Sequence, residues 1–478
     1  MPTTHLPRRT PESQGISSKS VLEFIEQVEK HGLEFHGFVL VRHGNVIAEG
    51  WWNPYSSGQV HLLYSYSKSF TSTAAGIAIA EGKFSLDDKV ISFFPEDVPA
   101  EVSTNLAAMK VRHLLSMASG HTEEPPNNTE NWVRSFLAKP VAKEPGTHFL
   151  YNSIATYMVS AIVQKTTGQR ITDYLGSRLF QPLGIEKLVS TRCPSGIDIG
   201  GWGMSATTED MAKLAQLYLQ RGVWNGKRLL TEAWVVEASR SHVSNGTNPE
   251  SDWNQGYGFQ FWRSKYGCFR GDGAFGQYGV VMPAQDAVFA ITSFVADMQK
   301  PLDLAWKHLL PAFQDKALPE NPAAQKELAV RMERLIVPAP EGQRSSIRAK
   351  AVSGITYAFD ANEQKISALR FDFGADEAQL TLKDENGEHI IRVGDGTWKR
   401  DTTTFKCNFA GKREFLRTAA SGGWVSDDTF KFKLAFYETP FGPVITCRFH
   451  EKGVTFDMQG NIGFGPSERP KLEGRSGS

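Results

Sequence analysis

The chain has 478 residues, more than one hydrophobic core usually supports, so the length predicts two domains. Hydrophobic residues make up 40% of it and charged residues 22%, which is ordinary for a globular protein. The 52 basic and 52 acidic residues cancel, which argues against nucleic acid or an anionic membrane as a main partner. No apolar run approaches the roughly 18–20 residues of a membrane span, and the polar start carries no secretory signal, so we expect a cytoplasmic protein.

Residues 1–316 are expected to form a mixed domain in which a hairpin, a long helical stretch and a strand meander follow one another. Helices are predicted at 18–30, 65–81, 111–117, 131–137, 154–167, 171–179, 208–221 and 302–313, and strands at 38–41, 46–48, 259–262, 278–282 and 287–293. If the hairpin meets the meander, they form one antiparallel sheet flanked by helices, an α/β fold with a helical insertion.

The remaining third of the chain has a different pattern. Residues 317–346 are rich in Pro, Ala and Glu and are predicted to form a linker with one helix at 324–335. Residues 347–470 are almost all strand-like, with short apolar runs at 366–373, 378–382, 389–393, 404–409, 429–437, 444–449 and 453–459. This spacing predicts an antiparallel barrel or sandwich, followed by a disordered tail at 471–478.

The cysteines do not suggest a metal site or a disulfide framework. Cys193, Cys268, Cys407 and Cys447 are scattered and form no CxxC pair, so we interpret them as ordinary thiols. The sequence also lacks HExxH, a phosphate-binding GxxxxGK[ST] loop and the Rossmann glycine pattern. No metal or cofactor is therefore expected.

The strongest chemical signal is a Ser-x-x-Lys, Ser65-Tyr66-Ser67-Lys68, at the start of an apolar predicted helix. A serine hydroxyl needs a base to become a nucleophile, and residues three apart share one helix face, so the Lys68 amine can reach the Ser65 oxygen. A chain of this length should contain about two such tetrapeptides by chance, and a helix-capping serine with a solvated lysine is the alternative. The apolar helix favours an enclosed lysine.

Two further segments carry candidate groups. Tyr151-Asn152-Ser153 precedes a predicted helix, and a tyrosine near a lysine can have a lowered pKa and act as a general base. The sequence from Arg270 to Tyr278 is Gly-rich and leads into a strand, which suits close approach of a ligand to the backbone. The alternatives are that Tyr151 is simply a packed side chain and that the Gly-rich segment is only a tight connection.

Together, and in this order, these elements resemble the serine β-lactamase-like superfamily over about residues 11–313. That superfamily includes penicillin-binding proteins, class C β-lactamases, and related esterases, D-aminopeptidases and 6-aminohexanoate-dimer hydrolases. Further segments are similar to the family's pattern: Glu81-Gly82-Lys83-Phe84-Ser85-Leu86-Asp87-Asp88, Val111–Met117 with Ser119-Gly120, Pro145-Gly146, Phe180-Gln181-Pro182-Leu183-Gly184 and Gly200-Gly201-Trp202-Gly203-Met204-Ser205. The resemblance implies a β-lactamase/transpeptidase-like fold.

The resemblance also implies roles for single residues. Ser65 would be the acylated nucleophile, Lys68 would share in its activation, and Tyr151 would be the base and later proton donor. The family's third motif, Lys/His-Thr/Ser-Gly, would fall on Gly271-Asp272-Gly273, with the N–H of Ala274 as the second oxyanion donor beside that of Ser65. A register starting at Cys268 would place that donor at Gly271 instead.

Two departures from the family pattern bear on the substrate. Ser153 stands where penicillin-recognising members usually have an Asn that helps hold the substrate amide. The third motif lacks its cation and has Asp272 instead, while Arg270 is displaced. Asp272 would either select an amino-bearing substrate or pair with Arg270. With these departures, the site motifs resemble those of the esterase and amide-hydrolase branch of the superfamily.

We therefore expect a serine hydrolase that cleaves an ester or amide bond of a small molecule, with Asn152, Ser153, Asp272 and Gly273 lining the substrate site. The alternatives are a β-lactam-recognising enzyme, either a β-lactamase or a D-Ala-D-Ala peptidase, and an acyltransferase. A catalytically inactive binding protein of the same fold is the alternative from another class. The oligomeric state is left open.

Overall fold

The chain divides into two compact units in the computed structural model, which describes residues 5–406, 415–461 and 469–477. The N-terminal unit comprises residues 1–51 and 57–334, and the C-terminal unit comprises residues 52–56 and 335–478. The boundary between the units falls inside the predicted linker, after residue 334. The linker's helix α12 (Pro322–Glu333) belongs to the N-terminal unit, where it packs against α1 (Ser18–Lys30). No helix within the described ranges is long and apolar enough to cross a lipid bilayer.

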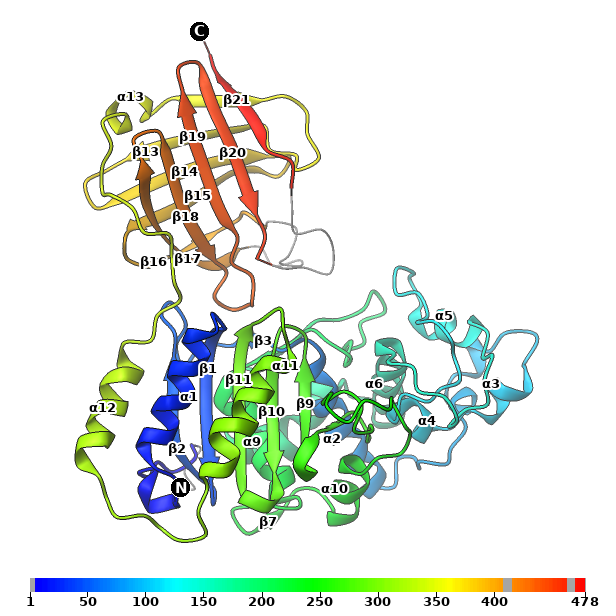
Figure 1. The fold of residues 1–478 in the computed structure, drawn as a ribbon. Coiled ribbons are helices and arrows are strands. Elements are labelled where there is room, and N and C mark those ends of the chain that lie inside the picture. Colours follow the sequence, from blue (N-terminus) through cyan, green and yellow to red (C-terminus); the bar gives the residue numbers. More distant parts are fainter. Residues whose placement is uncertain (1–4, 407–414, 462–468, 478) are drawn as a thin grey trace. The chain divides into compact units, whose positions relative to one another are not determined.

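An antiparallel sheet of six strands forms the centre of the N-terminal unit (Figure 1). Its order is β2 (Asn45–Trp51), β1 (Glu34–Arg42), β11 (Ala287–Phe294), β10 (Gln277–Met282), β9 (Phe269–Gly273) and β8 (Trp262–Arg263). The early hairpin thus pairs with the late meander through β1 and β11, as the sequence predicts. Both strands are buried almost throughout, as expected for central strands covered on two faces.

Alternate residues of the central strands face different helices. On one face, Phe38 of β1 and Phe289 of β11 contact Phe24 of α1, with ring centroids 5.8 and 5.6 Å away. On the other face, Val39 and Val288 join the large hydrophobic core that the helices share. The period of two along each strand therefore sends its side chains into two separate layers.

Helices fill the middle of the N-terminal unit. They are α2 (Ser67–Ala80), α3 (Thr104–Ala108), α4 (Val111–Leu115), α5 (Trp132–Ala138), α6 (Ser153–Thr167), α7 (Ile171–Leu175), α9 (Thr208–Leu219), α10 (Glu232–Ser239) and α11 (Gln299–Leu304). α2 is buried from Ser67 to Ala78 and packs against α6, because its small residues let neighbouring backbones approach closely. The sequence correctly predicts this helix as a central one.

The C-terminal unit is a closed β-barrel rather than a sandwich, so the structure decides between the two predicted forms. Nine strands form the ring: β15 (Gly387–Asp395), β14 (Glu377–Asp384), β13 (Ala368–Phe373), β12 (Thr356–Phe359), β21 (Leu472–Ser476), β20 (Gly453–Gln459), β19 (Val444–His450), β18 (Thr429–Ala435) and β17 (Leu416–Ser426). The ring closes where Gly394 pairs with Ser421. The short strand β16 (Lys399–Thr403) pairs with the first half of β17.

Two predictions for this unit need correction. The tail at 471–478 is predicted to be disordered, but Leu472–Ser476 forms β21 between β12 and β20, where its backbone groups complete the ring. A strand is predicted at 404–409, but pairing ends at Thr403, and residues 407–409 lie outside the described part of the chain.

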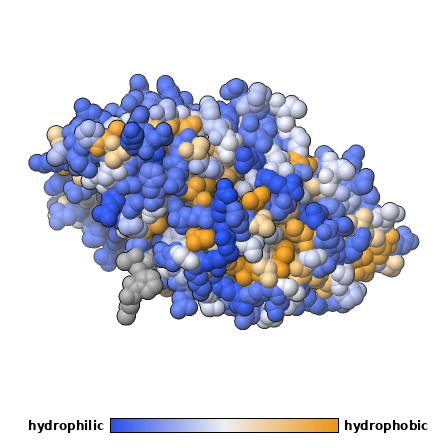
Figure 2. All heavy atoms as spheres, turned by 90° about the horizontal axis from the view of Figure 1, so that it is seen from below, coloured by the Kyte–Doolittle hydropathy of each residue, from blue (hydrophilic) through white to orange (hydrophobic). Residues whose placement is uncertain are grey.

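Exposed hydrophobic side chains are spread over several elements. Among the described residues, Val102, Val236 and Tyr266 are exposed on different parts of the N-terminal unit. On the face shown in Figure 2, hydrophobic residues form small groups between hydrophilic ones. Scattered exposure of this kind is normal for a protein surface and does not by itself indicate a docking face.

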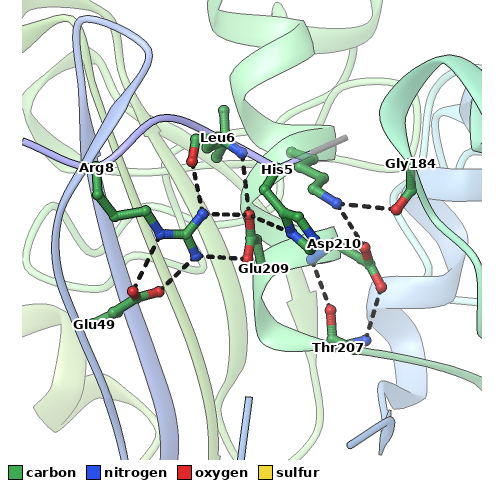
Figure 3. A network of polar contacts seen from close by, with 9 residues as sticks. His5, Leu6, Arg8, Glu49, Gly184, Thr207, Glu209 and Asp210 are labelled. Atoms are coloured by element: carbon green, nitrogen blue, oxygen red, sulfur yellow. Dashed lines mark hydrogen bonds and ion pairs between the residues drawn. The ribbon is translucent and has the colours of Figure 1, made fainter. Parts of the chain in front are cut away.

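A polar network ties the N-terminal segment to helix α9 (Figure 3). The Arg8 guanidinium donates to both carboxylate oxygens of Glu209, at 3.1 and 2.8 Å, and to Glu49 at 2.8 and 3.2 Å. The backbone N–H of Leu6 also donates to Glu209, at 3.2 Å. Burial alone would raise the pKa of Glu209, but these donors outweigh it and hold the pKa below its usual value.

Glu209→Gln is expected to lower the free energy of unfolding by about 1–2 kcal/mol, since the amide keeps the shape but loses the charge that Arg8 requires. A depressed pKa gives stability that is lost as pH falls, so the difference should shrink on acidification below about pH 4.5. Urea unfolding at pH 7 and pH 4 measures both effects. Glu250→Gln, at an exposed carboxylate 3.9 Å from Lys265, is the control, and equal losses in the two variants would contradict the prediction.

Candidate active site

The Ser-x-x-Lys segment lies where a tight turn enters helix α2. Ser65 is in the 3₁₀ turn Tyr64–Tyr66, and Lys68 is in the first turn of the helix. The preceding strand β3 (His61–Leu62) pairs with β5 (Met204–Ala206), which brings the segment around Gly201 alongside. A hydrogen bond from the Met204 N–H to the Ser67 hydroxyl, at 3.1 Å, fixes this approach.

Lys68 joins the segments of the site through three hydrogen bonds. Its Nζ donates to Ser65 Oγ at 3.0 Å, to Ser153 Oγ at 3.1 Å and to the carbonyl oxygen of Gly201 at 2.6 Å. The side chain is enclosed, as the apolar helix predicts, with the residue 1% exposed. Burial lowers the pKa of Lys68 to about 7, although nearby Glu124 and Asp272 act in the opposite direction. Near neutral pH the amine therefore exists partly in its neutral, proton-accepting form.

Tyr151 lies beside this lysine in an aromatic enclosure. The ring stacks on Trp262 with centroids 5.3 Å apart and meets Tyr257 edge-on at 6.2 Å, while Lys68 Nζ lies 4.8 Å from its centroid. Burial raises the pKa of Tyr151, partly offset by hydrogen bonding with Ser65 and Trp262. The lowered pKa expected from sequence is therefore wrong, because the enclosure disfavours a phenolate.

Asn152 and Ser153 have different surroundings. Ser153 Oγ accepts from Lys68, a contact that the sequence did not predict. Asn152 is fully buried, and its Oδ1 caps helix α6 by accepting from the Ala155 N–H at 2.9 Å. This capping contact gives Asn152 a structural role at the helix start.

Glu124 is a neighbour of the site that has no sequence signal. Its Oε1 accepts from the N–H groups of Ser153 at 2.6 Å and Ile154 at 3.3 Å, so it neutralises the positive end of α6. It comes from the loop at 121–131, whose composition fits a plain surface loop equally well. His121 of the same loop is buried against Phe136 and hydrogen-bonded to Ser119, which is a packing role.

The Gly-rich segment forms strand β9 and the turn into β10, so it is itself a strand and not a plain connection. A side chain at Gly273 would lie 2.1 Å from the carbonyl oxygen of Leu63, so only glycine permits this approach to the nucleophile turn. A side chain at Gly271 would instead meet Tyr66 and Ser69, deeper in the core. The end of the strand that carries Ala274 is thus the part beside Ser65.

The backbone N–H groups of Ser65 and Ala274 have no hydrogen-bond acceptor among the described residues. Both residues are partly exposed, whereas Tyr66, Gly273 and Phe275 beside them are buried. The Gln277 side-chain amide donates to the carbonyl of Ala274 at 3.1 Å. The N–H of Ala274 therefore remains as the backbone group of this residue that can donate to a substrate. Two such donors suit a developing oxyanion.

Asp272 pairs with Arg270, which was one of its two predicted roles. Arg270 donates through Nε at 2.9 Å and lies at 2.8 Å through Nη2, both to Oδ2, and both side chains are buried. Arg270 also lies over the Trp253 ring at 4.6 Å. Desolvation raises the pKa of Asp272 to about 6 despite this partner. The guanidinium is therefore locked in place and is not available to bind a substrate carboxylate.

Of the strand predicted at 259–262, only Trp262 lies in a strand, the short β8, and the reason lies in Gln260. Its backbone is left-handed, with φ +67°, because its side-chain amide donates to the carbonyls of Leu114 and Leu115 and accepts from Thr156. The Gln260 carbonyl accepts from Ser69 at 3.1 Å. This residue therefore connects α2, α4 and α6 behind the site, a long-range function that local pattern does not reveal.

Trp262→Leu is expected to lower kcat for an activated ester about tenfold, because Tyr151 loses both its stacking surface and a hydrogen-bond partner. Trp262→Phe keeps the stacking surface and should stay within about threefold of the parent. Steady-state kinetics with p-nitrophenyl butyrate measures both. Equal rates for the Leu variant and the parent would show that Tyr151 does not depend on this contact.

Comparison with known proteins places the chain in a family. The family model described as Beta-lactamase matches residues 25–309, more than half of the chain. The chain is 26% identical to the 6-aminohexanoate-dimer hydrolase of Paenarthrobacter ureafaciens, over 41% of this chain and 55% of that protein. It is 24% identical to a beta-lactamase of Escherichia coli (strain K12), over 35% of this chain and 50% of that protein. It thus spans about half the length of these curated relatives.

A solved structure shows the same fold across both units. The crystal structure of SurE with D-Leu aligns with a TM-score of 0.51 and 17% identity, covering 96% of this chain and 98% of that chain. At this identity the likeness concerns the fold alone. The family model, which covers the sheet, the helices and all the site segments, carries the assignment: the chain belongs to the beta-lactamase family.

Proposed function

We propose that the protein is a serine hydrolase that cleaves an ester or amide bond of a small molecule through an acyl-enzyme on Ser65. The observation that carries the proposal is the 3.0 Å contact between Ser65 Oγ and the buried amine of Lys68, whose pKa is lowered to about 7. A nucleophilic hydroxyl beside a base that is partly neutral near pH 7 is the arrangement that acyl transfer requires.

In acylation, neutral Lys68 takes the hydroxyl proton as Ser65 Oγ bonds to the substrate carbonyl carbon. The carbonyl oxygen becomes an oxyanion, which accepts hydrogen bonds from the N–H groups of Ser65 and Ala274. Tyr151 hydrogen-bonds with Ser65 as a neutral phenol and passes the proton from the Lys68 ammonium to the leaving group. The bond to that group breaks, the alcohol or amine departs, and the acyl-enzyme remains.

In deacylation, the same groups act on water. Neutral Lys68, directly or through Tyr151, takes a proton from water, and the hydroxide attacks the acyl carbon. The second oxyanion rests on the same two N–H groups, and the proton returns to Ser65 as its bond to carbon breaks. The product is the free acid. Ser153, hydrogen-bonded to Lys68, keeps the amine aligned between these partners.

The charges around the site favour substrates without a recognition carboxylate. The third motif offers no free cation, because Arg270 is buried and bound to Asp272. A β-lactam or a peptide terminus carries a carboxylate that such a cation normally binds. Esters and amides that are recognised without a carboxylate therefore fit the proposal better than β-lactams.

Intact-protein mass spectrometry after incubation with a fluorophosphonate tests the proposal, with peptide mapping of the adduct. Turnover of p-nitrophenyl butyrate, a p-nitroanilide amide and the β-lactam nitrocefin is measured in parallel. One adduct on the peptide containing Ser65, with ester or amide turnover, is expected. Turnover of nitrocefin alone would favour the β-lactam-recognising alternative, and a folded protein with no adduct and no turnover would favour a binding protein.

A further inference from the structure

We propose that Tyr64 and Phe275 form an aromatic brace that sets the distance between the two oxyanion donors. Tyr64 directly precedes Ser65, and Phe275 directly follows Ala274, so each ring is one residue away from a donor N–H. Tyr64 lies outside the motifs found in the sequence, and Phe275 lies in the Gly-rich segment from Arg270 to Tyr278, where no role is predicted for it. The inference rests on the proposed function, because it assigns a positioning role in the same acyl-transfer site.

Both residues have an uncommon backbone conformation. The φ angle is +48° at Tyr64 and +66° at Phe275, a left-handed region that normally favours glycine or asparagine. Bulky side chains persist there only when their surroundings fix them, and such outliers cluster at functional sites. Here both outliers flank candidate oxyanion donors.

The two rings contact each other directly. Tyr64 meets Phe275 edge-on, with centroids 5.3 Å apart and an interplanar angle of 80°. Phe275 also packs against Phe294 at 5.7 Å, which connects the pair to the central sheet. The close approach of Gly273 to the Leu63 carbonyl is a second contact between the same two turns. The nucleophile turn and the β9–β10 turn are therefore joined at two points close to the donors.

Hydrogen bonds anchor each of the two turns to its own surroundings. The Phe275 carbonyl accepts from the Val295 N–H at 3.1 Å and from the Ser293 hydroxyl at 2.9 Å, so the β9–β10 turn is anchored to β11. In the nucleophile turn, the Tyr64 carbonyl accepts from the Ser67 hydroxyl at 2.6 Å and the Leu63 N–H donates to the Met204 carbonyl at 2.9 Å. The contact between the Tyr64 and Phe275 rings is one of the links between the two turns. Since an oxyanion needs both donors at about 2.7–3.1 Å, loss of the ring contact should separate them and slow acylation.

Glycine variants provide the sharpest test, because glycine adopts both φ angles without strain while removing the ring. For Tyr64→Gly and Phe275→Gly we expect the rate of fluorophosphonate labelling and the kcat for p-nitrophenyl butyrate to fall about 10–100-fold. KM should stay within about threefold. Inhibition by phenylboronic acid, whose tetrahedral adduct places an oxygen at the oxyanion position, should weaken in parallel with kcat. The double variant should lose little more than the worse single variant, because both remove one contact.

Conservative and distant variants separate positioning from folding. Tyr64→Phe and Phe275→Tyr keep the rings and should keep the labelling rate. Tyr266→Gly is the matched control, since Tyr266 also has positive φ (+59°) and meets another ring, Trp306, edge-on at 5.8 Å. This control should label at the parent rate.

The outcomes distinguish the brace from the proposed function. If the parent protein is labelled on Ser65 and the folded glycine variants are labelled equally fast, the brace is overturned and the hydrolase proposal stands. If the parent protein is not labelled, the hydrolase proposal itself is contradicted. Should a glycine variant not fold by circular dichroism, Tyr64→Leu and Phe275→Leu decide, since they keep bulk but lose the edge-on contact; an unchanged rate would overturn the brace.

Discussion

Replacing Ser65 with alanine is expected to abolish fluorophosphonate labelling and to reduce ester turnover by at least about 10³-fold. Without the hydroxyl no acyl-enzyme can form, and Lys68 keeps its contacts with Ser153 and Gly201. The fold should not change, because the Ser65 hydroxyl contacts only the site's own groups. Mass spectrometry of the adduct and steady-state hydrolysis of p-nitrophenyl butyrate measure the two effects.

Ser72→Ala is the matched control for this prediction. Ser72 lies further along the same helix, and its hydroxyl donates to the carbonyl of Phe259 at 2.7 Å, behind the site. The variant should be labelled at the parent rate, although some stability should be lost. Undiminished labelling of Ser65→Ala would instead show that another nucleophile reacts with the probe.

The contact between Ser65 and Lys68 could be predicted from sequence because it depends on local geometry. Three residues on a helix span one face, and the apolar composition of the helix indicates that the lysine is enclosed. The approach of Tyr151 and Ser153 required the resemblance, since α2 and α6 are joined by long-range packing. The buried strands β1 and β11 were predictable for the same reason as the helix, because their apolar runs are local.

Features that depend on distant partners could not be predicted. Gln260 looks like part of a strand, but carbonyls more than a hundred residues earlier pull its backbone into a left-handed conformation. Glu124 lies in an unremarkable polar loop, and its contact with the α6 N-terminus becomes visible only in three dimensions. The predicted direction of the Tyr151 pKa shift is wrong because burial of the phenol disfavours its charged form more than its hydrogen bonds favour it, and the local sequence does not show this enclosure.

The C-terminal barrel illustrates the same limit for a whole domain. Alternating apolar residues predict strands and therefore a β-domain, but closure depends on a pairing between Gly394 of β15 and Ser421 of β17. The last strand, β21, is too polar to resemble a strand by itself. It is stabilised because two neighbouring strands accept its backbone groups.

Lys68→Met is expected to reduce ester turnover by about 10³-fold or more, because Lys68 is the group that contacts the Ser65 hydroxyl and has a pKa, about 7, suited to taking its proton near neutral pH. In the parent, the amine acts as a base only when neutral. The rate of acylation should therefore rise with pH through a single inflection near the Lys68 pKa of about 7 and be lost below it. The pH dependence of fluorophosphonate labelling measures this, and an inflection absent between pH 5 and 9 would contradict it.

The same substitution should stabilise the fold. A loss of activity together with a gain in stability distinguishes a catalytic lysine from one that stabilises the structure. A lysine whose pKa falls from 10.5 to about 7 on folding destabilises the folded state fully below pH 7, and the penalty fades as pH rises toward 10.5. Lys68→Met should therefore raise the free energy of unfolding by about 1–3 kcal/mol at pH 6, with a smaller gain at pH 9. The lost hydrogen bonds limit the gain.

Lys213→Met is the matched comparison for stability. Lys213 is equally buried, but its amine lies 3.3 Å from the buried carboxylate of Asp210, so its removal leaves that charge unpaired. It should destabilise the fold by about 3 kcal/mol, as breaking a buried ion pair usually does, while leaving the labelling inflection near pH 7 in place. Urea unfolding of both variants at pH 6 and pH 9 tests the contrast. A Lys68→Met variant less stable than the parent at both pH values would mean that the amine is held charged by its neighbours, and the general-base role would then pass to Tyr151.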